Sequence, residues 1–139
     1  MSNKKVYFGL GADILHHGHI NLIEKARRYG TIIVGLITDE AIASHKRLPI
    51  FNYEQRKKII ENIRGVSKVV PQNDWDYSIN IKKYKPEYMI HGDDWAQGPL
   101  MNLRKKAINA LSRYGGKLIE LPYTKGASST ALSSSQALL

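Results

Sequence analysis

Short apolar runs alternate along the chain with longer segments in which apolar residues recur at helical spacing. Residues 5–10 and 32–37 are apolar and strand-like, whereas residues 20–29 place Ile20 and Ile23 on one face of a helix. A strand, a helix and a second strand in this order predict parallel pairing of the two strands. The alternation then continues, with further helices expected at 53–63, 77–84 and 100–114 and further strands at 68–71, 88–91 and 117–121.

Local signals mark two of these helix boundaries. Asn52, followed three residues later by Gln55, predicts a capping box at the start of one helix, and Gly115-Gly116 predicts the end of another. The alternation predicts a single Rossmann-like α/β domain over residues 1–139, with a parallel five-stranded sheet and helices on both faces. Ligands of such sheets bind at the carboxyl ends of the strands, so functional residues are expected in the segments that follow each strand.

Composition narrows the chemistry open to the chain. Its 139 residues are 42% hydrophobic, which suits one compact domain with an ordinary buried core. No apolar run reaches about 18 residues and residues 1–5 lead directly into a strand, so we expect a cytoplasmic protein without a membrane span or signal peptide. The absence of cysteine excludes disulfides, thiolate metal sites and cysteine nucleophiles.

The formal net charge of +9 at pH 7 indicates an anionic partner. Nucleic acid, membrane headgroups and phosphorylated small molecules would all be attracted by it. The basic residues are scattered over the expected helices, without the aromatic interleaving of a single-strand nucleic-acid platform. We therefore expect a phosphorylated small molecule as the partner, with no nucleic acid and no membrane; nucleic-acid binding stays a rival on charge alone.

The segment from Gly9 to His19 joins the first strand to the first helix and is expected to bind an anion. Its glycines allow close backbone approach, and the helix N-terminus presents free amides. His16 and His19 are three residues apart, so both imidazoles can face one phosphate as hydrogen-bond donors or as positive charges. A helix cap with surface histidines is the alternative; a metal pair lacks an obvious third ligand, and an ionised phosphoryl oxygen needs no general base.

Two signatures in their order and separation resemble those of a known enzyme family. His16-x-Gly18-His19 resembles the HxGH signature of the cytidylyltransferase-like nucleotidyltransferases, and Ser128 to Thr130 resembles their serine- and threonine-rich helix start. Gly92-Asp93-Asp94-Trp95 resembles the GDDW motif of the small cytidylyltransferases, especially glycerol-3-phosphate cytidylyltransferase. The resemblance covers nearly the whole chain and includes Thr38-Asp39-Glu40, Tyr53-Glu54-x-Arg56 and Arg64.

The resemblance implies transfer of CMP from CTP, with Mg²⁺ as the cofactor and pyrophosphate as the product. An indole can stack on a pyrimidine, a carboxylate can hold an amine or a divalent ion, and a flexible ammonium can follow the charge of a triphosphate. The expected catalytic residues are His16, His19 and Lys46, and the expected nucleotide-binding residues are Gly11, Ala12, Gly18, Asp94, Trp95, Ser128, Ser129 and Thr130. The acceptor is expected at Arg47, Arg64 and Tyr123, and the metal at Asp13.

Each of these roles has a plainer alternative. Lys46, Arg47 and Arg64 could belong to a solvated face. Trp95 could be a packed loop aromatic, and Asp13 could simply form a turn.

Three departures from glycerol-3-phosphate cytidylyltransferase bear on the acceptor. Leu10 to Asp13 replace its usual Gly-Thr-Phe-Asp, Tyr123 stands where an arginine is expected, and His91 precedes the GDDW motif. These positions resemble the cytidylyltransferase domains fused to phosphoenolpyruvate mutase in phosphonate biosynthesis. That resemblance implies 2-hydroxyethylphosphonate or 2-aminoethylphosphonate as the acceptor and a parent chain that also carries a mutase. The family's habit implies a homodimer.

Rival functions stay open at this point. Glycerol 3-phosphate is the alternative acceptor, and an adenylyltransferase that uses ATP is disfavoured because Asp94-Trp95 suits cytosine. A non-catalytic nucleotide-binding module that regulates a fused partner is a different class. Intact His16 and His19 count against it, because a binding module has no need of groups that act in the transition state.

Overall fold

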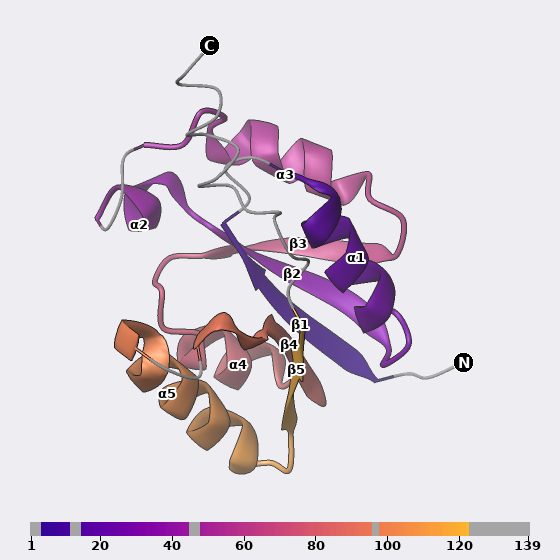
Figure 1. Cartoon of the computed structure of the whole chain (residues 1–139), viewed down its shortest axis with the longest axis vertical. Helices are drawn as coiled ribbons and strands as arrows, with labels where there is room; N and C mark the ends of the chain where they lie inside the picture. Colours follow the sequence, from indigo (N-terminus) through magenta and orange to yellow (C-terminus); the bar gives the residue numbers. More distant parts are fainter. Residues whose placement is uncertain (1–3, 12–14, 45–47, 96–97, 123–139) are drawn as a thin grey trace.

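A five-stranded parallel sheet forms the centre of the fold, as the sequence predicts (Figure 1). The computed structural model describes residues 4–11, 15–44, 48–95 and 98–122. The strands are β1 (Lys5–Leu10), β2 (Thr31–Ile37), β3 (Val66–Gln72), β4 (Tyr88–Gly92) and β5 (Lys117–Leu121). They lie in the order β3-β2-β1-β4-β5, and each neighbouring pair is parallel.

Helices cover both faces of the sheet, which confirms the predicted architecture (Figure 1). The helices are α1 (His17–Ala26), α2 (Asp39–Ala43), α3 (Tyr53–Glu61), α4 (Ser78–Tyr84) and α5 (Met101–Ser112), with 3₁₀ turns η1 (Asp93–Trp95) and η2 (Gly98–Leu100). Helices α1 and α3 lie over one face, and α4 and α5 lie over the other. Within the described ranges, no helix has the length and apolar character needed to cross a bilayer.

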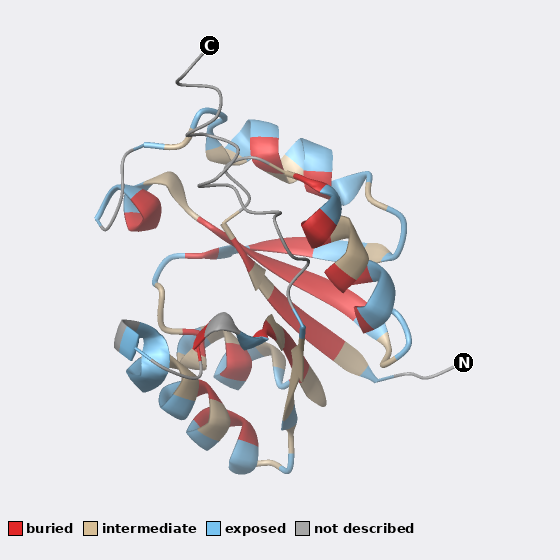
Figure 2. Cartoon of the chain, in the orientation of Figure 1, coloured by how far each residue is buried: buried red, intermediate tan, exposed pale blue. Residues whose placement is uncertain are grey.

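Strand alternation divides the core into two clusters, one on each side of the sheet. Val6 and Phe8 of β1 pack with α1 and α3, whereas Tyr7 between them packs with α4 and α5. Buried residues therefore concentrate in the strands and on the inner sides of the helices, and the outer sides of the helices are exposed (Figure 2). This double covering explains why the strands are apolar runs rather than alternating ones.

Two predicted helix boundaries are confirmed by their hydrogen bonds. Asn52 Oδ1 accepts from the Gln55 backbone N–H at 2.9 Å, and Gln55 Oε1 accepts from the Asn52 N–H at 3.0 Å. At the end of α5, Gly115 has a φ of 84°, and the Gly116 N–H donates to the Leu111 carbonyl at 2.9 Å. This is the left-handed helix stop for which glycine is favoured.

Other boundaries differ from the prediction for local reasons. Helix α1 begins at His17 rather than Ile20, because His16 itself caps it. Helix α2, from Asp39 to Ala43, has no predicted range, since a helix of five residues is too short to show a helical period.

The strand order marks the expected position of a ligand at the carboxyl edge of the sheet. Central strand β1 pairs with β2 on one side and with β4 on the other, so the strand order reverses at the β1–β4 boundary. Ligands of doubly wound sheets bind outside the carboxyl ends of the strands at such a point. The segments that follow β1 and β4 border it, and they contain the HxGH and GDDW sequences.

Candidate functional site

The N-terminus of α1 is capped by two histidine side chains. His16 has an extended backbone, and its Nδ1 accepts from the Gly18 backbone N–H at 3.1 Å. His19 reaches back, and its Nδ1 accepts from the His16 backbone N–H at 3.2 Å. The pair forms a reciprocal capping box in which imidazoles take the place of the usual hydroxyl and carboxylate groups.

These bonds decide which nitrogen of each ring carries the proton. A ring nitrogen that accepts a hydrogen bond is unprotonated, so each neutral ring carries its hydrogen on Nε2. Burial lowers the pKa of His19 to about 4, and burial followed by the nearby His17 lowers the pKa of His16. Both rings are therefore neutral near pH 7, a state in which each can donate a hydrogen bond from Nε2.

The two imidazoles lie against each other. Their ring centroids are 3.9 Å apart with an interplanar angle of 29°, so the two side chains are direct neighbours. The Nε2 of His16 is buried and has no hydrogen-bond partner within the described ranges. A buried N–H without a partner is costly, so this donor is suited to a bound acceptor such as a phosphate oxygen.

The predicted glycines of this segment have distinct roles. A Cβ on Gly11 would meet no described atom within 4 Å, so the space beside its backbone is open to a ligand. A Cβ on Gly9 would lie 2.1 Å from the Tyr77 ring, so this glycine admits a core aromatic. Gly18 is buried, and its amide already serves His16. Gly18 thus contributes to the histidine cap, and its predicted nucleotide contact stays a prediction.

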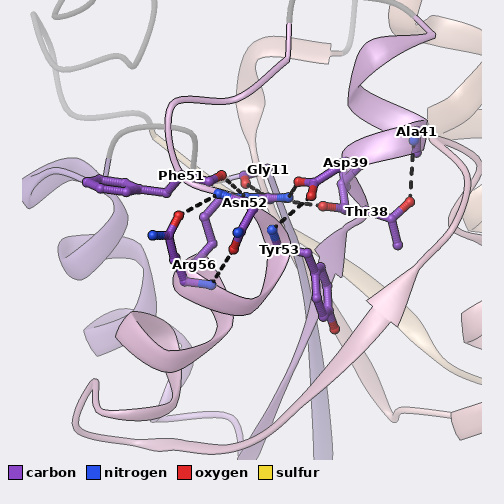
Figure 3. A network of polar contacts seen from close by, with 10 residues as sticks. Gly11, Thr38, Asp39, Ala41, Phe51, Asn52, Tyr53 and Arg56 are labelled. Carbon is purple, nitrogen blue, oxygen red and sulfur yellow. Dashed lines mark hydrogen bonds and ion pairs between the residues drawn. The ribbon is translucent and has the colours of Figure 1, made fainter.

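A buried arginine holds the neighbouring segments in place (Figure 3). The Arg56 side chain is only 1% exposed. It donates to four acceptors, namely the carbonyl oxygens of Phe51 at 3.0 Å, Gly11 at 2.6 Å and Ile37 at 2.9 Å and the Asp39 Oδ1 at 2.7 Å. It therefore ties the ends of β1 and β2 to the starts of α2 and α3. Arg56 belongs to the Tyr53-Glu54-x-Arg56 motif, in which it has no predicted role.

Two further bonds complete this network. The Tyr53 N–H donates to Asp39 Oδ2 at 3.1 Å, and Thr38 Oγ1 caps α2 by accepting from the Ala41 N–H at 3.3 Å (Figure 3). Asp39 thus receives the first helical amide of α3 and the Arg56 guanidinium at the same time. The carboxyl edge beside the β1 loop is consequently fixed before any ligand binds.

Trp95, the last residue of the GDDW sequence, is packed into the core rather than displayed. It is 1% exposed, and its ring stacks on His91 with centroids 3.6 Å apart and an interplanar angle of 9°. Its Nε1–H donates to Glu120 Oε2 at 2.9 Å. The predicted stacking of this indole on a pyrimidine would need the ring to be uncovered, and it stays a prediction. Asp94, its neighbour, lies in the same 3₁₀ turn η1.

The structure does not bring Arg64 to the site. This residue is exposed and lies between α3 and β3, at the edge of the sheet where the strands begin. Within one copy of the chain, the structure therefore gives no support to the predicted acceptor contact of Arg64, which stays a prediction. The physical reason is that α3 starts at the carboxyl edge and runs back across the sheet, which carries its last residues away from His16.

Several predicted residues lie outside the described ranges. They are Ala12, Asp13, Lys46, Arg47, Tyr123, Ser128, Ser129 and Thr130. Within the described ranges, no group of three or more histidine, aspartate or glutamate side chains could hold a metal ion. The histidine side chains at the α1 cap offer imidazole nitrogens as metal ligands, whereas Mg²⁺ prefers oxygen ligands. A Mg²⁺ held at Asp13 stays a prediction.

Similar sequences are found among proteins named as cytidylyltransferases. Glycerol-3-phosphate cytidylyltransferase of Bacillus spizizenii is 35% identical over 129 residues, which cover 91% of this chain and 92% of that protein. Ethanolamine-phosphate cytidylyltransferase of Mus musculus is 38% identical over 84 residues, which cover 59% of this chain and 21% of that protein.

The fold and the family agree with these similarities. The crystal structure of a lipopolysaccharide core biosynthesis protein from Thermoplasma volcanium GSS1 matches with a TM-score of 0.74 at 19% identity, covering 88% of this chain and 98% of that one. It supports the fold alone. The family model described as Cytidylyltransferase-like matches residues 8–135, which confirms the nucleotidyltransferase class expected from the sequence. The chain belongs to the cytidylyltransferase-like family.

Proposed function

We propose that the chain transfers CMP from CTP to a small phosphate ester and releases pyrophosphate, with glycerol 3-phosphate as the first acceptor to test. The observation that carries the proposal is the pair of neutral imidazoles at the start of α1. Each has its Nδ1 engaged by a backbone N–H and its hydrogen on Nε2, where a phosphate oxygen can accept it. The carboxyl edge beside β1 supplies the place where such sheets bind nucleotides.

The reaction needs charge stabilisation more than proton transfer. An ionised oxygen of the acceptor phosphate attacks the α-phosphorus of CTP, a new P–O bond forms, and the bond from that phosphorus to the pyrophosphate oxygen breaks. His16 and His19 would donate to the α-phosphate oxygens as these become more negative. Because the acceptor arrives deprotonated, the histidines can keep their protons throughout, in agreement with their lowered pKa values.

The remaining predicted residues have proposed parts in the same reaction. Lys46 would follow the triphosphate charge, and Arg47 and Tyr123 would contact the acceptor. The amides and hydroxyls of Ser128 to Thr130 would hold phosphate, as the family resemblance implies. Mg²⁺ bound to the triphosphate would screen the β and γ phosphates, with Asp13 as its candidate protein ligand.

A phosphate ester is proposed over a phosphonate because of the relatives described above. The chain covers 92% of a protein named glycerol-3-phosphate cytidylyltransferase, and a second relative is named for ethanolamine phosphate. Neither name includes a phosphonate. The three sequence departures still justify testing 2-hydroxyethylphosphonate and 2-aminoethylphosphonate beside the phosphate esters.

The test is pyrophosphate release by the purified chain with Mg²⁺, using CTP or ATP. The acceptors are glycerol 3-phosphate, ethanolamine phosphate, the two phosphonates, and none. Release that needs both CTP and glycerol 3-phosphate is the expected result. A preference for a phosphonate would overturn the proposed acceptor, and CTP binding without release with any acceptor would favour a non-catalytic binding module.

The His16→Asn variant tests the role of the histidine donor. Asparagine is a good helix cap, so its side-chain oxygen can replace Nδ1 while the Nε2–H is lost. We expect kcat to fall about 10²- to 10³-fold with little change in stability. His17→Asn is the matched control, because His17 is exposed and directly adjacent, and it should keep near-wild-type activity. Equal activity of both variants would contradict the proposal.

A further inference from the structure

An ion pair joins α5 to the last strand of the sheet. Arg104 donates from Nε to Glu120 Oε2 at 3.0 Å and from Nη2 to Glu120 Oε1 at 2.7 Å. The two side chains are 32% and 24% exposed, so the pair lies at the rim of the core. A guanidinium that grips both oxygens of a carboxylate fixes its orientation as well as its position.

The same carboxylate holds Trp95. Glu120 Oε2 accepts from the Trp95 Nε1–H at 2.9 Å, and the hydrogen bonds from Arg104 and from the indole keep the pKa of Glu120 below its ordinary value. His91 is the sheet partner of Glu120 across β4 and β5. Trp95 stacks on this histidine, so its ring is fixed by a face-to-face contact and by a hydrogen bond to adjacent strands. The indole therefore has little freedom to turn.

The position of Trp95 controls a short segment next to the candidate site. Trp95 ends η1, which follows β4 directly at the carboxyl edge of the sheet. Strand β4 is the neighbour of β1, whose following segment carries His16. Fixing the indole thus fixes the backbone from Gly92 to Trp95 at the carboxyl edge of the sheet.

We infer that Glu120, held by Arg104, is a positioning residue that keeps the Gly92–Trp95 segment in the conformation that binds CTP. The inference rests on the proposed function, because it requires CTP as the nucleotide. Glu120 acts through Trp95 and has no part in the bond-breaking step. Its loss should therefore weaken CTP binding far more than it slows turnover at saturation.

The test compares Glu120→Leu with Glu120→Gln. Leucine removes the hydrogen bonds from Arg104 and from the Trp95 indole, whereas the glutamine amide oxygen can still accept from the indole. We expect the Kd and KM for CTP to rise about tenfold in Glu120→Leu, with kcat within about twofold of wild type and the acceptor KM unchanged. Glu120→Gln should restore most of the CTP affinity. Arg104→Met, which leaves the Glu120–Trp95 bond in place, should give a smaller rise and serves if Glu120→Leu does not fold.

Lys106→Met is the matched control, because it removes another ion pair of α5, with Asp76 at 3.9 Å, that does not involve Trp95. It should leave CTP affinity unchanged. The indole N–H signals in a proton–nitrogen NMR spectrum give a readout independent of activity. Trp95 and Trp75 both have bonded indoles, and only the Trp95 signal should move in Glu120→Leu.

The outcomes separate the inference from the proposed function. One outcome would overturn this inference alone. The wild-type chain binds and uses CTP, and the Trp95 signal moves in a folded Glu120→Leu variant, but the Kd of that variant for CTP is unchanged. A fall of about tenfold in kcat with no change in the Kd for CTP would overturn it too. A positioning role in binding predicts a higher Kd for CTP and a nearly unchanged kcat. A wild-type chain that binds no CTP would overturn both.

Discussion

The guanidinium of Arg56 and the carboxylate of Asp39 form an ion pair, 2.7 Å from Nη2 to Oδ1, in which the arginine is buried and the aspartate is 29% exposed. The same guanidinium satisfies backbone carbonyls at the ends of β1 and β2. A charge in this position is costly to bury and is stabilised because its N–H groups meet three carbonyl oxygens and one carboxylate. The pair therefore joins the stability of the fold to the shape of the candidate site.

Replacing Arg56 by methionine should destabilise the chain by about 3–5 kcal/mol, because it leaves Asp39 and the carbonyls without their partner. The free energy of unfolding in urea measures this change. Arg28→Met is the control, since Arg28 is exposed after α1, and it should stay within about 0.5 kcal/mol of wild type. A loss of less than about 1 kcal/mol in Arg56→Met would show that the network is dispensable.

The capping box at the start of α3 gives a smaller effect. Asn52→Ala removes the side-chain acceptor for the Gln55 N–H and should lower stability by about 1 kcal/mol. Asn73→Ala, at an exposed position after β3, should be close to neutral in the same urea titration. If both variants lose the same stability, the cost arises from the substitution itself and not from the cap.

The sequence predicts what depends on local pattern. All five strands were placed to within about two residues, because apolar runs between polar segments are a local signal. The Asn52 cap and the Gly115-Gly116 stop were also predicted, since each depends on residues within one helical turn. Helix α1 starts early because a histidine caps it, and histidine is not among the common capping residues.

What the sequence could not predict depends on residues far apart in the chain. Arg56 stands beside Lys57 and Lys58, and nothing local shows that it alone turns inward to partners 17 and 45 residues earlier. The hydrogen-bond acceptor of Trp95 lies 25 residues later in the chain, so the sequence did not show whether its ring is buried or exposed on a loop. The proximity of His16 and His19 was predictable, because helical spacing sets it, whereas their neutral state depends on burial.

His19 should make the stability of the chain depend on pH in a defined window. Burial lowers its pKa in the folded chain from 6.5 to about 4, so the unfolded chain binds the proton more readily. The contribution of His19 to the free energy of unfolding is fully present above pH 6.5 and is lost as the pH falls to about 4. The difference is roughly 3 kcal/mol. Urea titrations at several pH values measure this slope.

His19→Asn is the control for this dependence. Asparagine can keep the bond to the His16 N–H but does not titrate, so the variant should lose less stability over the same window. The difference between the two slopes isolates His19 from the other groups that titrate there. Identical slopes would mean that His19 is not held neutral by the fold.

The contact between Gly9 and Tyr77 is testable as a coupling between two residues. A Cβ on Gly9 would lie 2.1 Å from the Tyr77 ring, which is buried and meets Trp95 edge-on at 5.6 Å. Gly9→Ala should therefore cost about 1–3 kcal/mol, because the ring cannot move without disturbing Trp95. In a Tyr77→Leu background the flat ring is gone, and the cost of Gly9→Ala should fall by at least about 1 kcal/mol.

Tyr77→Phe distinguishes a steric clash from the loss of the hydroxyl. Phenylalanine keeps the ring beside Gly9, so the cost of Gly9→Ala should be as large in this background as in the wild type. Urea unfolding of the single and double variants completes the cycle. Gly9→Ala could instead cost the same stability in the wild type and in both Tyr77 backgrounds. The backbone at Gly9 would then give way instead of the ring, and the glycine would serve the following segment rather than the core.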